Sequence, residues 1–455
     1  MAELLSVGLD VGTTSTQLIL SRLAVENKGG AFSVPEMVIE GRTLLYQSPV
    51  IFTPLVSEDR VDGEAIARWV SEQYALAGVE KAQVNTGAVI ITGETSRKEN
   101  AREVLNALSG FAGDFVVATA GPDLESVLSA KGAGATDFSA ATGKSLLHMD
   151  IGGGTSNLSY IENGKITRTG CLNVGGRLIK FDQAGAISYI SPVLSRLCDL
   201  KTGQIPTESQ LSQVVDLLVQ ALEMAADLRP QTALLEAFAT LEAAKPWVPQ
   251  KADVVSFSGG VADCIDSAHE THAFGDLGVR LGRAIRASAL CRGEFRLGEH
   301  TIRATVIGAG CHSTQLSGST VFIHQVPLPK QNLPVVCLPA PITAEAVAEA
   351  YVGQDNEQVV LYFPGEQAPS YASVQALAKA FTDGSGDRDL FICLQADMAK
   401  ALGHAIHLLA PRKKCLCIDR VMLAPESYLD LGAPVGPALP VVVKTLILSA
   451  KENNF

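Results

Sequence analysis

Short runs of apolar residues alternate with segments of helical spacing over the first part of the chain. Runs of four to eight apolar or β-branched residues between glycine and polar residues predict strands, and apolar positions three or four residues apart predict helices. We therefore expect strands at residues 4–9, 16–21, 88–92 and 115–118, and helices at 64–77, 98–108 and 123–131. Such an alternation is typical of an α/β layer.

A second block begins with a strand at residues 146–151 and contains the longest predicted helix, at 208–228. Apolar residues of this helix fall on one face, and Thr207 with Gln210 fits a capping box at its start. Two further strands are expected, at residues 254–258 and 303–307.

A third block follows Pro327, Pro329 and Pro334, which together predict a linker or an extended crossing. Beyond the prolines the pattern is again that of an α/β layer. It predicts helices at 345–351, 372–381 and 397–409, and strands at 358–362, 390–394, 416–421 and 441–448.

Composition narrows the class of protein. At 455 residues the chain has room for about three domains. Its 47% hydrophobic residues exclude global disorder, and its net charge of −12 argues against a nucleic-acid-binding protein. No apolar run is long enough to cross a membrane, and no signal peptide is evident. The nine unpatterned cysteines suggest reduced thiols, so a cytoplasmic protein is expected.

Two turns of the chain resemble each other. Asp-Val-Gly-Thr-Thr at residues 10–14 and Asp-Ile-Gly-Gly-Gly-Thr at 150–155 each follow an apolar strand and precede an alternating one. The two aspartates are 140 residues apart, which is about one domain. Two strand–turn–strand hairpins at this spacing indicate two related lobes that face each other. Ordinary tight hairpin turns are the alternative reading of either turn alone.

The chemistry of these turns points to a polyphosphate. Glycine lets backbone N–H groups converge on an anion, and threonine hydroxyls donate further hydrogen bonds. Carboxylates repel phosphate, so Asp10 and Asp150 make sense as ligands of a Mg²⁺ ion and its waters. The residues expected to cradle phosphates are Gly12, Thr13, Thr14, Gly152, Gly153, Gly154 and Thr155.

A third turn follows the strand predicted at 254–258. The sequence Ser-Gly-Gly-Val at 258–261 lets a flat group such as adenine press against the backbone of Gly259 and Gly260. Competing nucleotide motifs fail, because the P-loop-like Thr142–Ser145 has Phe138 where the motif needs its first glycine.

In this order, the three turns resemble the phosphate and adenosine motifs of the actin, Hsp70 and sugar-kinase superfamily. The resemblance implies an α/β fold of two actin-like (RNase H-like) ATPase lobes, at 1–145 and 146–325, followed by a C-terminal α/β segment at 326–455. It further implies that Glu125 orients or deprotonates the attacking water, with Asp10, Asp150 and Thr13 as the other catalytic residues. A solvated helix carboxylate is the alternative reading of Glu125.

A closer resemblance extends over nearly the whole chain. Residues 48–54, 91–94, 113–118, 120–127, 171–177, 303–310 and 428–434 are similar to the EutA family, the reactivating factors of ethanolamine ammonia-lyase. This resemblance implies a chaperone-like ATPase that uses Mg-ATP to exchange damaged cobalamin on the lyase for intact adenosylcobalamin. It also implies a homodimer and association with an ethanolamine-utilisation microcompartment, and it adds Gly175 and Gly176 to the candidate nucleotide contacts.

Three other functions remain open on the sequence. A small-molecule kinase would use the same ATP clamp with an aspartate as the base. A filament-forming or membrane-tethered actin relative and an iron–sulfur activator of a dehydratase fit less well. The first would need a C-terminal amphipathic helix, whereas the last strongly patterned segment, 441–448, reads as a strand. The second would need close cysteine ligands at a shared interface, and the scattered cysteines argue against it.

Overall fold

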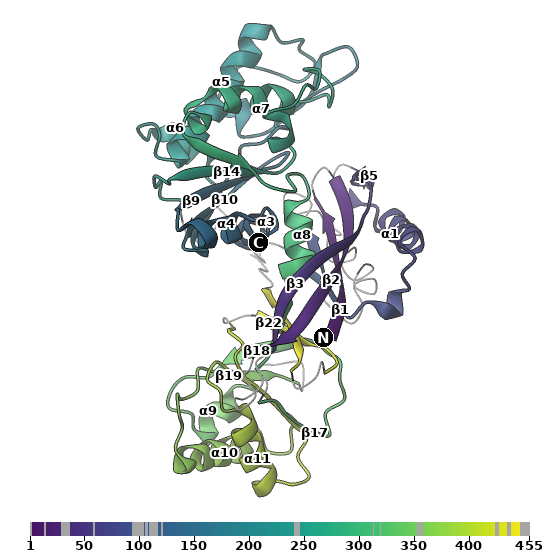
Figure 1. The fold of residues 1–455 in the computed structure, drawn as a ribbon. Coiled ribbons are helices and arrows are strands. Elements are labelled where there is room, and N and C mark those ends of the chain that lie inside the picture. The colour runs from purple at the N-terminus through teal and green to yellow at the C-terminus, as the bar shows by residue number, and fades with distance from the viewer. Residues whose placement is uncertain are drawn as a thin grey trace, which may run out of the picture.

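The fold consists of three α/β bodies that follow one another along the molecule (Figure 1). It was analysed in a computed structural model, which describes residues 2–12, 15–28, 37–57, 60–92, 104, 108, 117–119, 122–240, 246–312, 314–318, 320–352, 358–423, 427–434 and 438–445. The two outer bodies are the second lobe and the C-terminal block, and the first lobe lies between them (Figure 1).

The first lobe is built on a mixed sheet with the strand order β3-β2-β1-β7-β8. Strands β1, β2 and β3 are antiparallel neighbours, whereas β7 and β8 continue the sheet parallel to β1. Helix α1 covers the outer face. The bounds are β1 Ala2–Val11, β2 Ser15–Asn27, β3 Met37–Gln47, β7 Thr86–Ile91, β8 Val117–Thr119 and α1 Gly63–Ala77, with short strands β4 Ile51–Phe52, β5 Leu55–Ser57 and β6 Arg60–Val61.

The second lobe repeats this sheet with the order β11-β10-β9-β14-β15 and the same strand directions. Its bounds are β9 Leu146–Ile151, β10 Ser156–Glu162, β11 Lys165–Leu172, β14 Val254–Ser258 and β15 Glu294–Leu297. A separate hairpin joins β12 Ile179–Phe181 to β13 Ile187–Ile190. The repeated topology confirms the predicted pair of RNase H-like lobes.

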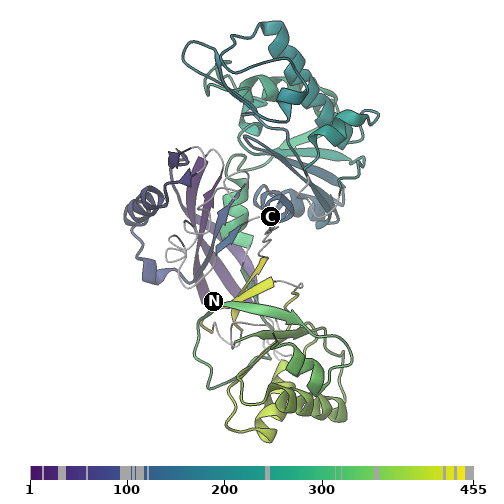
Figure 2. The same ribbon diagram turned by 180° about the vertical axis from the view of Figure 1, so that it is seen from behind.

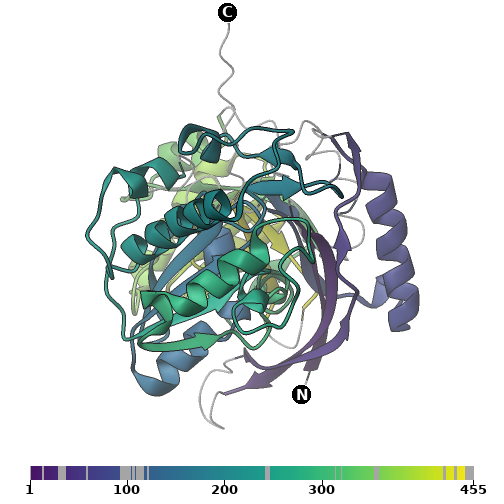
Figure 3. The same ribbon diagram turned by 90° about the horizontal axis from the view of Figure 1, so that it is seen from above.

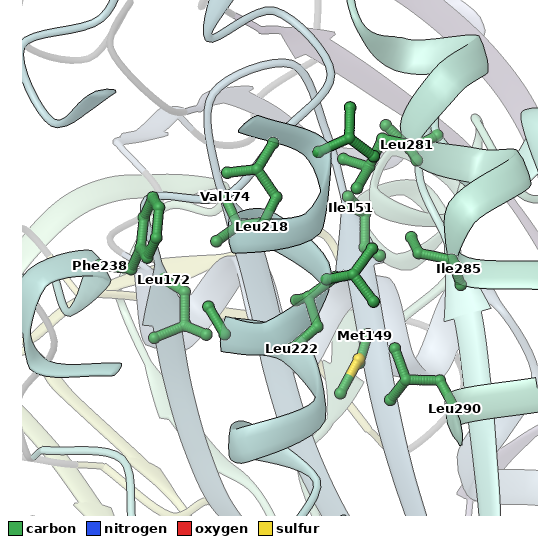
Figure 4. Close-up of a cluster of buried hydrophobic side chains, with 14 of the residues drawn as sticks. Met149, Ile151, Leu172, Val174, Leu218, Leu222, Phe238, Leu281, Ile285 and Leu290 are labelled. Carbon is green, nitrogen blue, oxygen red and sulfur yellow. The ribbon is translucent and has the colours of Figure 1, made fainter. Parts of the chain in front are cut away.

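Helices α5 (Glu208–Ala225) and α7 (Gly278–Ala287) lie over the outer face of the second sheet, as the view from above shows (Figure 3). Leu218 and Leu222 of α5 meet Met149 and Ile151 of β9 in a fully buried core (Figure 4). The predicted capping box of Thr207 and Gln210 is present at the start of α5. The short α6 (Ala233–Phe238) closes one side of this core.

Two helices cross between the lobes. Helix α3 (Pro122–Gly132) leaves the first lobe and packs on the inner face of the second sheet together with α4 (Ala135–Thr142). Helix α8 (Ala304–His312) returns from the second lobe and packs on the inner face of the first sheet (Figure 2). The crossing helices touch at backbone distance, since a Cβ on Gly308 would lie 2.0 Å from the Leu128 carbonyl oxygen.

The C-terminal block holds an eight-stranded sheet with the order β16-β23-β22-β18-β19-β20-β21-β17. Its parallel centre is flanked by antiparallel strands, and three helices cover one face. The strands are β16 Thr314–Leu316, β17 Phe322–His324, β18 Lys330–Cys337, β19 Val360–Phe363, β20 Leu390–Leu394, β21 Cys415–Ile418, β22 Ser427–Leu431 and β23 Pro440–Thr445, and the helices are α9 Ala344–Glu349, α10 Tyr371–Ser385 and α11 Ala399–Leu409.

Three elements differ from the sequence-based expectation. The strand expected at residues 303–307 is wrong, because this segment forms the first turns of helix α8, and a short apolar run does not distinguish a strand from a buried helix. The proline-bearing stretch is not only a linker, because it ends in strand β18, where Pro334 lies opposite Tyr428 beyond an irregular register. Helix α5 ends three residues before the predicted position, because Asp227 adopts a left-handed conformation with φ of 55°. Most of the helix expected at 98–108 lies outside the described residues.

Among the described helices, none is both long enough and apolar enough to cross a bilayer.

Candidate functional site

The two matched turns close in the same way. In the first turn the Gly12 N–H donates to the Ser15 carbonyl at 2.9 Å, and in the second the Gly152 N–H donates to the Thr155 carbonyl at 2.9 Å. Thr13 and Thr14 lie outside the described residues. A Cβ on Gly154 would meet no atom within 4 Å, so open space adjoins the second turn.

The two aspartates end the central strands of the two lobes, on the inner faces that the crossing helices cover. Asp10 and Asp150 are 7% and 6% exposed. Asp10 Oδ1 accepts a hydrogen bond from the Thr92 hydroxyl at 2.9 Å. Asp150 accepts from Ser258 at Oδ1 and from Thr305 at Oδ2, the latter at 3.3 Å. Each carboxylate therefore has hydroxyl donors but no basic partner among these contacts.

Burial raises the pKa of Asp10 to about 7, while the hydrogen bond from Thr92 opposes the rise. The charge of Asp150 raises the Asp10 pKa further, and a hydrogen bond from Gln17 lowers it. Burial also raises the pKa of Asp150, to about 6, against the hydrogen bonds from Ser258 and Thr305. Two desolvated carboxylates that repel each other are a site at which a cation would be stabilised.

A buried amide lies across the hairpin from each aspartate. Gln17 pairs with Asp10 in the sheet register, and Asn157 pairs with Asp150. Both side chains are 2% exposed, and within the described part of the chain Gln17 Oε1 and Asn157 Oδ1 have no hydrogen-bond partner. An unpaired buried oxygen is costly, so these two atoms suit a ligand or its waters. The set of oxygen donors fits hydrated Mg²⁺.

The other predicted glycines pack closely around the second turn. The Gly176 N–H donates to the Gly152 carbonyl at 3.0 Å, and a Cβ on Gly175 would lie 2.3 Å from the Gly153 oxygen. Gly259 has φ of 85°, and a Cβ there would lie 2.3 Å from the Ile151 oxygen. These close approaches already require glycine at 175 and 259, and a contact of either residue with a nucleotide stays a prediction.

Glu125 lies in the first turn of α3 beside Asp123, which accepts a hydrogen bond from Thr169. It is half-buried. Its predicted role toward a water molecule stays a prediction. Within the described ranges, no three His, Cys, Asp or Glu side chains are grouped so that they could hold a metal ion.

Several contacts join the lobes beside the turns. Gln17 Nε2 donates to the Ile302 carbonyl at 2.9 Å, and Arg303 Nη1 donates to the Ser48 carbonyl at 2.8 Å. The Arg177 guanidinium lies 5.1 Å from the centre of the Phe52 ring. Residues next to each of the two turns therefore make the contacts between the lobes.

Sequence reasoning missed five polar residues of this site. Gln17 and Asn157 had a usable signal, because each comes seven residues after its aspartate and the two belong to the same repeat. Thr92 and Thr305 gave no such signal, and Ser258 was recognised only as part of the Ser-Gly-Gly-Val turn. They reach the carboxylates from 82, 108 and 155 residues away in the chain.

Similarity to one protein family extends over nearly the whole chain. The family model described as "Ethanolamine utilisation protein EutA" matches residues 2–449. The chain is 36% identical over 471 aligned positions to the ethanolamine ammonia-lyase reactivase EutA of Salmonella typhimurium, with 98% of each chain covered. The reactivase EutA of Escherichia coli gives the same identity and coverage. Among solved structures, a Ppx/GppA family member from Aquifex aeolicus matches with a TM-score of 0.42 at 13% identity, covering 68% of this chain and 97% of that chain.

Proposed function

The chain belongs to the family of the ethanolamine utilisation protein EutA, and on that basis we propose that it is an ATP-driven reactivase of ethanolamine ammonia-lyase. One observation supports the nucleotide part most directly. Two buried aspartates, each with an unpaired amide oxygen opposite, end the central strands of two lobes with the same topology.

In this proposal Asp10 and Asp150 hold Mg²⁺, in part through its water molecules, and Gln17 and Asn157 accept hydrogen bonds from those waters. When bound, the ion would neutralise charge on the phosphates and on the two carboxylates. The residues that would cradle the phosphates are Gly12, Thr13, Thr14, Gly152, Gly153, Gly154 and Thr155. Gly175, Gly176, Gly259 and Gly260 would lie against the rest of the nucleotide.

Hydrolysis requires a group that orients or deprotonates water, and we assign this role to Glu125 on α3. Because α3 crosses from one lobe to the other, a change in lobe closure would move Glu125 relative to the first turn. The Thr13 hydroxyl would donate to the transferred phosphate. Slow turnover suits a protein that works by switching between two states.

The bound nucleotide would control the lyase by changing which arrangement of the two lobes is populated, because the arrangements bind the lyase with different affinity. A nucleotide shifts the lobes only by the difference in its affinity for their open and closed arrangements. A hundredfold shift between the open and closed arrangements requires a difference in binding free energy of about 2.7 kcal/mol. Contacts with a γ-phosphate and its ion are able to supply this difference. The contacts of Arg177 with Phe52 and of Arg303 with Ser48 are the ones that closure would strengthen or break.

On the client, the proposal is that the nucleotide-bound reactivase loosens the lyase around a cobalamin that has lost its adenosyl group. The damaged cobalamin leaves and intact adenosylcobalamin enters. We further propose that the protein acts as a homodimer, together with the ethanolamine-utilisation microcompartment.

A rescue assay tests this function. Ethanolamine ammonia-lyase is blocked with a cobalamin that lacks the adenosyl group, and acetaldehyde is followed after addition of this chain, Mg-ATP and adenosylcobalamin. Recovery that needs both ATP and the chain, and that fails with Asp10→Ala, supports the proposal. ATP hydrolysis without recovery of the lyase would show that this lyase is not the protein's partner. ADP release that depends on an added small molecule would favour the kinase alternative.

A further inference from the structure

A chain of hydrogen bonds runs from Asp150 into the core of the second lobe. The Ser258 hydroxyl donates to Asp150 Oδ1, and His148 Nε2 lies 2.9 Å from Ser258 Oγ. On the other side of the ring, His148 Nδ1 lies 3.1 Å from Ser256 Oγ. All four side chains lie on the inner face of neighbouring strands, since Ser256 pairs with His148 and Ser258 with Asp150.

None of the three supporting residues reaches solvent. His148, Ser256 and Ser258 are each 0% exposed. Both ring nitrogens lie against serine hydroxyls inside the core, where an imidazolium would lose its hydration, so the ring is neutral and carries one N–H. A buried neutral imidazole with two hydroxyl neighbours has only two ways to distribute its protons.

Proton counting selects one of them. Ser258 has a single hydroxyl proton, and an ionised Asp150 can only accept, so Ser258 must donate to Asp150. Ser258 Oγ then accepts from His148 Nε2–H, and His148 Nδ1 accepts from the Ser256 hydroxyl. In the other tautomer the Ser258 hydroxyl would donate to Nε2, and a lone pair of Ser258 Oγ would face the carboxylate. The tautomer of His148 thus determines whether Ser258 can donate to Asp150.

We propose that His148 is a positioning residue for Asp150, acting through the Ser258 hydroxyl. The chain of donors holds Oδ1 toward the core, and Oδ2, which accepts from Thr305, keeps a lone pair for a ligand. This inference rests on the proposed function, in which that lone pair contacts Mg²⁺ or its waters. Supporting groups of this kind commonly alter metal affinity without touching the metal.

Two substitutions of the same residue separate positioning from packing. Glutamine places its amide nitrogen near the position of Nε2 and can still donate to Ser258. Asparagine is one methylene shorter and reaches only toward Ser256. His148→Gln and His148→Asn both keep a polar side chain in the core, so loss of the hydrogen bond to Ser258 is the feature that distinguishes them.

The experiment is a calorimetric titration of each variant with ADP, in Mg²⁺ and in EDTA. We expect His148→Asn to weaken ADP binding about tenfold in Mg²⁺ and by less than about twofold in EDTA. His148→Gln should stay within about threefold of the unaltered protein in both. In a protein that already carries Ser258→Ala, His148→Asn should weaken ADP binding in Mg²⁺ by less than about twofold more, because the hydroxyl that links His148 to Asp150 is absent.

The inference would be overturned by any of three results. The two variants could lose equal ADP affinity, the loss could be equal with and without Mg²⁺, or the effect of His148→Asn could be undiminished in the Ser258→Ala background. Nitrogen NMR of the unaltered protein tests it independently of any substitution. We expect a His148 ring protonated at Nε2, and the Nδ1–H tautomer would refute the proton count. If Mg²⁺ leaves ADP affinity unchanged in the unaltered protein, the proposed metal role fails, and the tautomer still decides the inference.

Discussion

The two lobes share strand order and turn closure, yet they support their aspartates differently. Two residues before the aspartate, the first lobe has Gly8 and the second has His148. Helix α8 passes so close to Gly8 that a Cβ there would lie 2.4 Å from the Val306 oxygen. Beneath α3 there is room for an imidazole and its two serines. The two lobes therefore share the turn, whereas the groups that support each carboxylate depend on which helix packs over its sheet.

The largest expected effect comes from removing either carboxylate. Asp10→Ala and Asp150→Ala should each lower ATP hydrolysis on the order of 100-fold or more, because each removes half of the proposed cation site. Steady-state ADP release measures this, and circular dichroism checks that the fold is retained. A variant that hydrolyses ATP at the normal rate would show that its lobe does not contribute the carboxylate we assign.

A second comparison concerns the crossing helices. A Cβ on Gly132 would lie 1.8 Å from the Ala304 oxygen, and one on Gly308 would lie 2.0 Å from the Leu128 oxygen. Gly132→Ala and Gly308→Ala should therefore each cost roughly 2–3 kcal/mol by overpacking, or about 5–10 °C in melting temperature. Gly293→Ala is the control, since a Cβ there meets nothing within 4 Å. A loss in only one of the two would show that the crossings are not equivalent.

The raised pKa values give a pH-dependent stability. In Asp10 the folded pKa of about 7 exceeds its ordinary value of 3.8, so the folded state is favoured at low pH and loses stability as the pH rises from about 4 to 7. Asp10→Asn removes that loss. In EDTA it should raise the melting temperature at pH 8 by about 2–4 °C, and the gain should vanish near pH 4.

Asp150→Asn is the matched variant. Its folded pKa of about 6 lies closer to the ordinary value, so its gain at pH 8 should be smaller than that of Asp10→Asn. Thermal melts across pH 4–8 measure both variants. A larger gain at Asp150 would mean that its two hydroxyl donors stabilise the charge less than the one hydroxyl and the amide at Asp10.

The smallest effect is expected at the contact between the lobes. Phe52 is 70% exposed, and the Arg177 guanidinium lies 5.1 Å from the centre of its ring. Phe52→Ala should speed release of a fluorescent ADP about threefold, the loss of one exposed cation–π contact. Leu76→Ala, an exposed residue on α1, is the control. No change in release would show that this contact is not made in the nucleotide-bound state.

Much of the fold was predictable because its signals are local. The strand at residues 390–394 has the bounds that its apolar run predicted, and the two hairpins were visible as a repeat. Strand β18 was harder to predict, because proline normally ends a strand and Pro334 is tolerated here only beyond an irregular register. The predicted division of the chain at 145 and 325 stays a prediction.

The site was predictable only in part, for a different physical reason. Glycine and aspartate in a turn reveal an anion and a cation site, because that chemistry depends on neighbours in sequence. Thr305 meets Asp150 only because α8 begins beside the second sheet and then crosses to the first. Contacts made by crossing elements depend on tertiary packing, which a pattern along the chain does not encode.

The end of helix α8 has a mechanical consequence. Strand β16 begins at Thr314, two residues after α8 ends at His312, and it is an edge strand of the eight-stranded sheet. Strands β16 and β23 also lie against β3 and β8 of the first lobe. The C-terminal block is therefore attached to the lobe on which α8 packs, and a change in lobe closure would carry that block with the first lobe relative to the second.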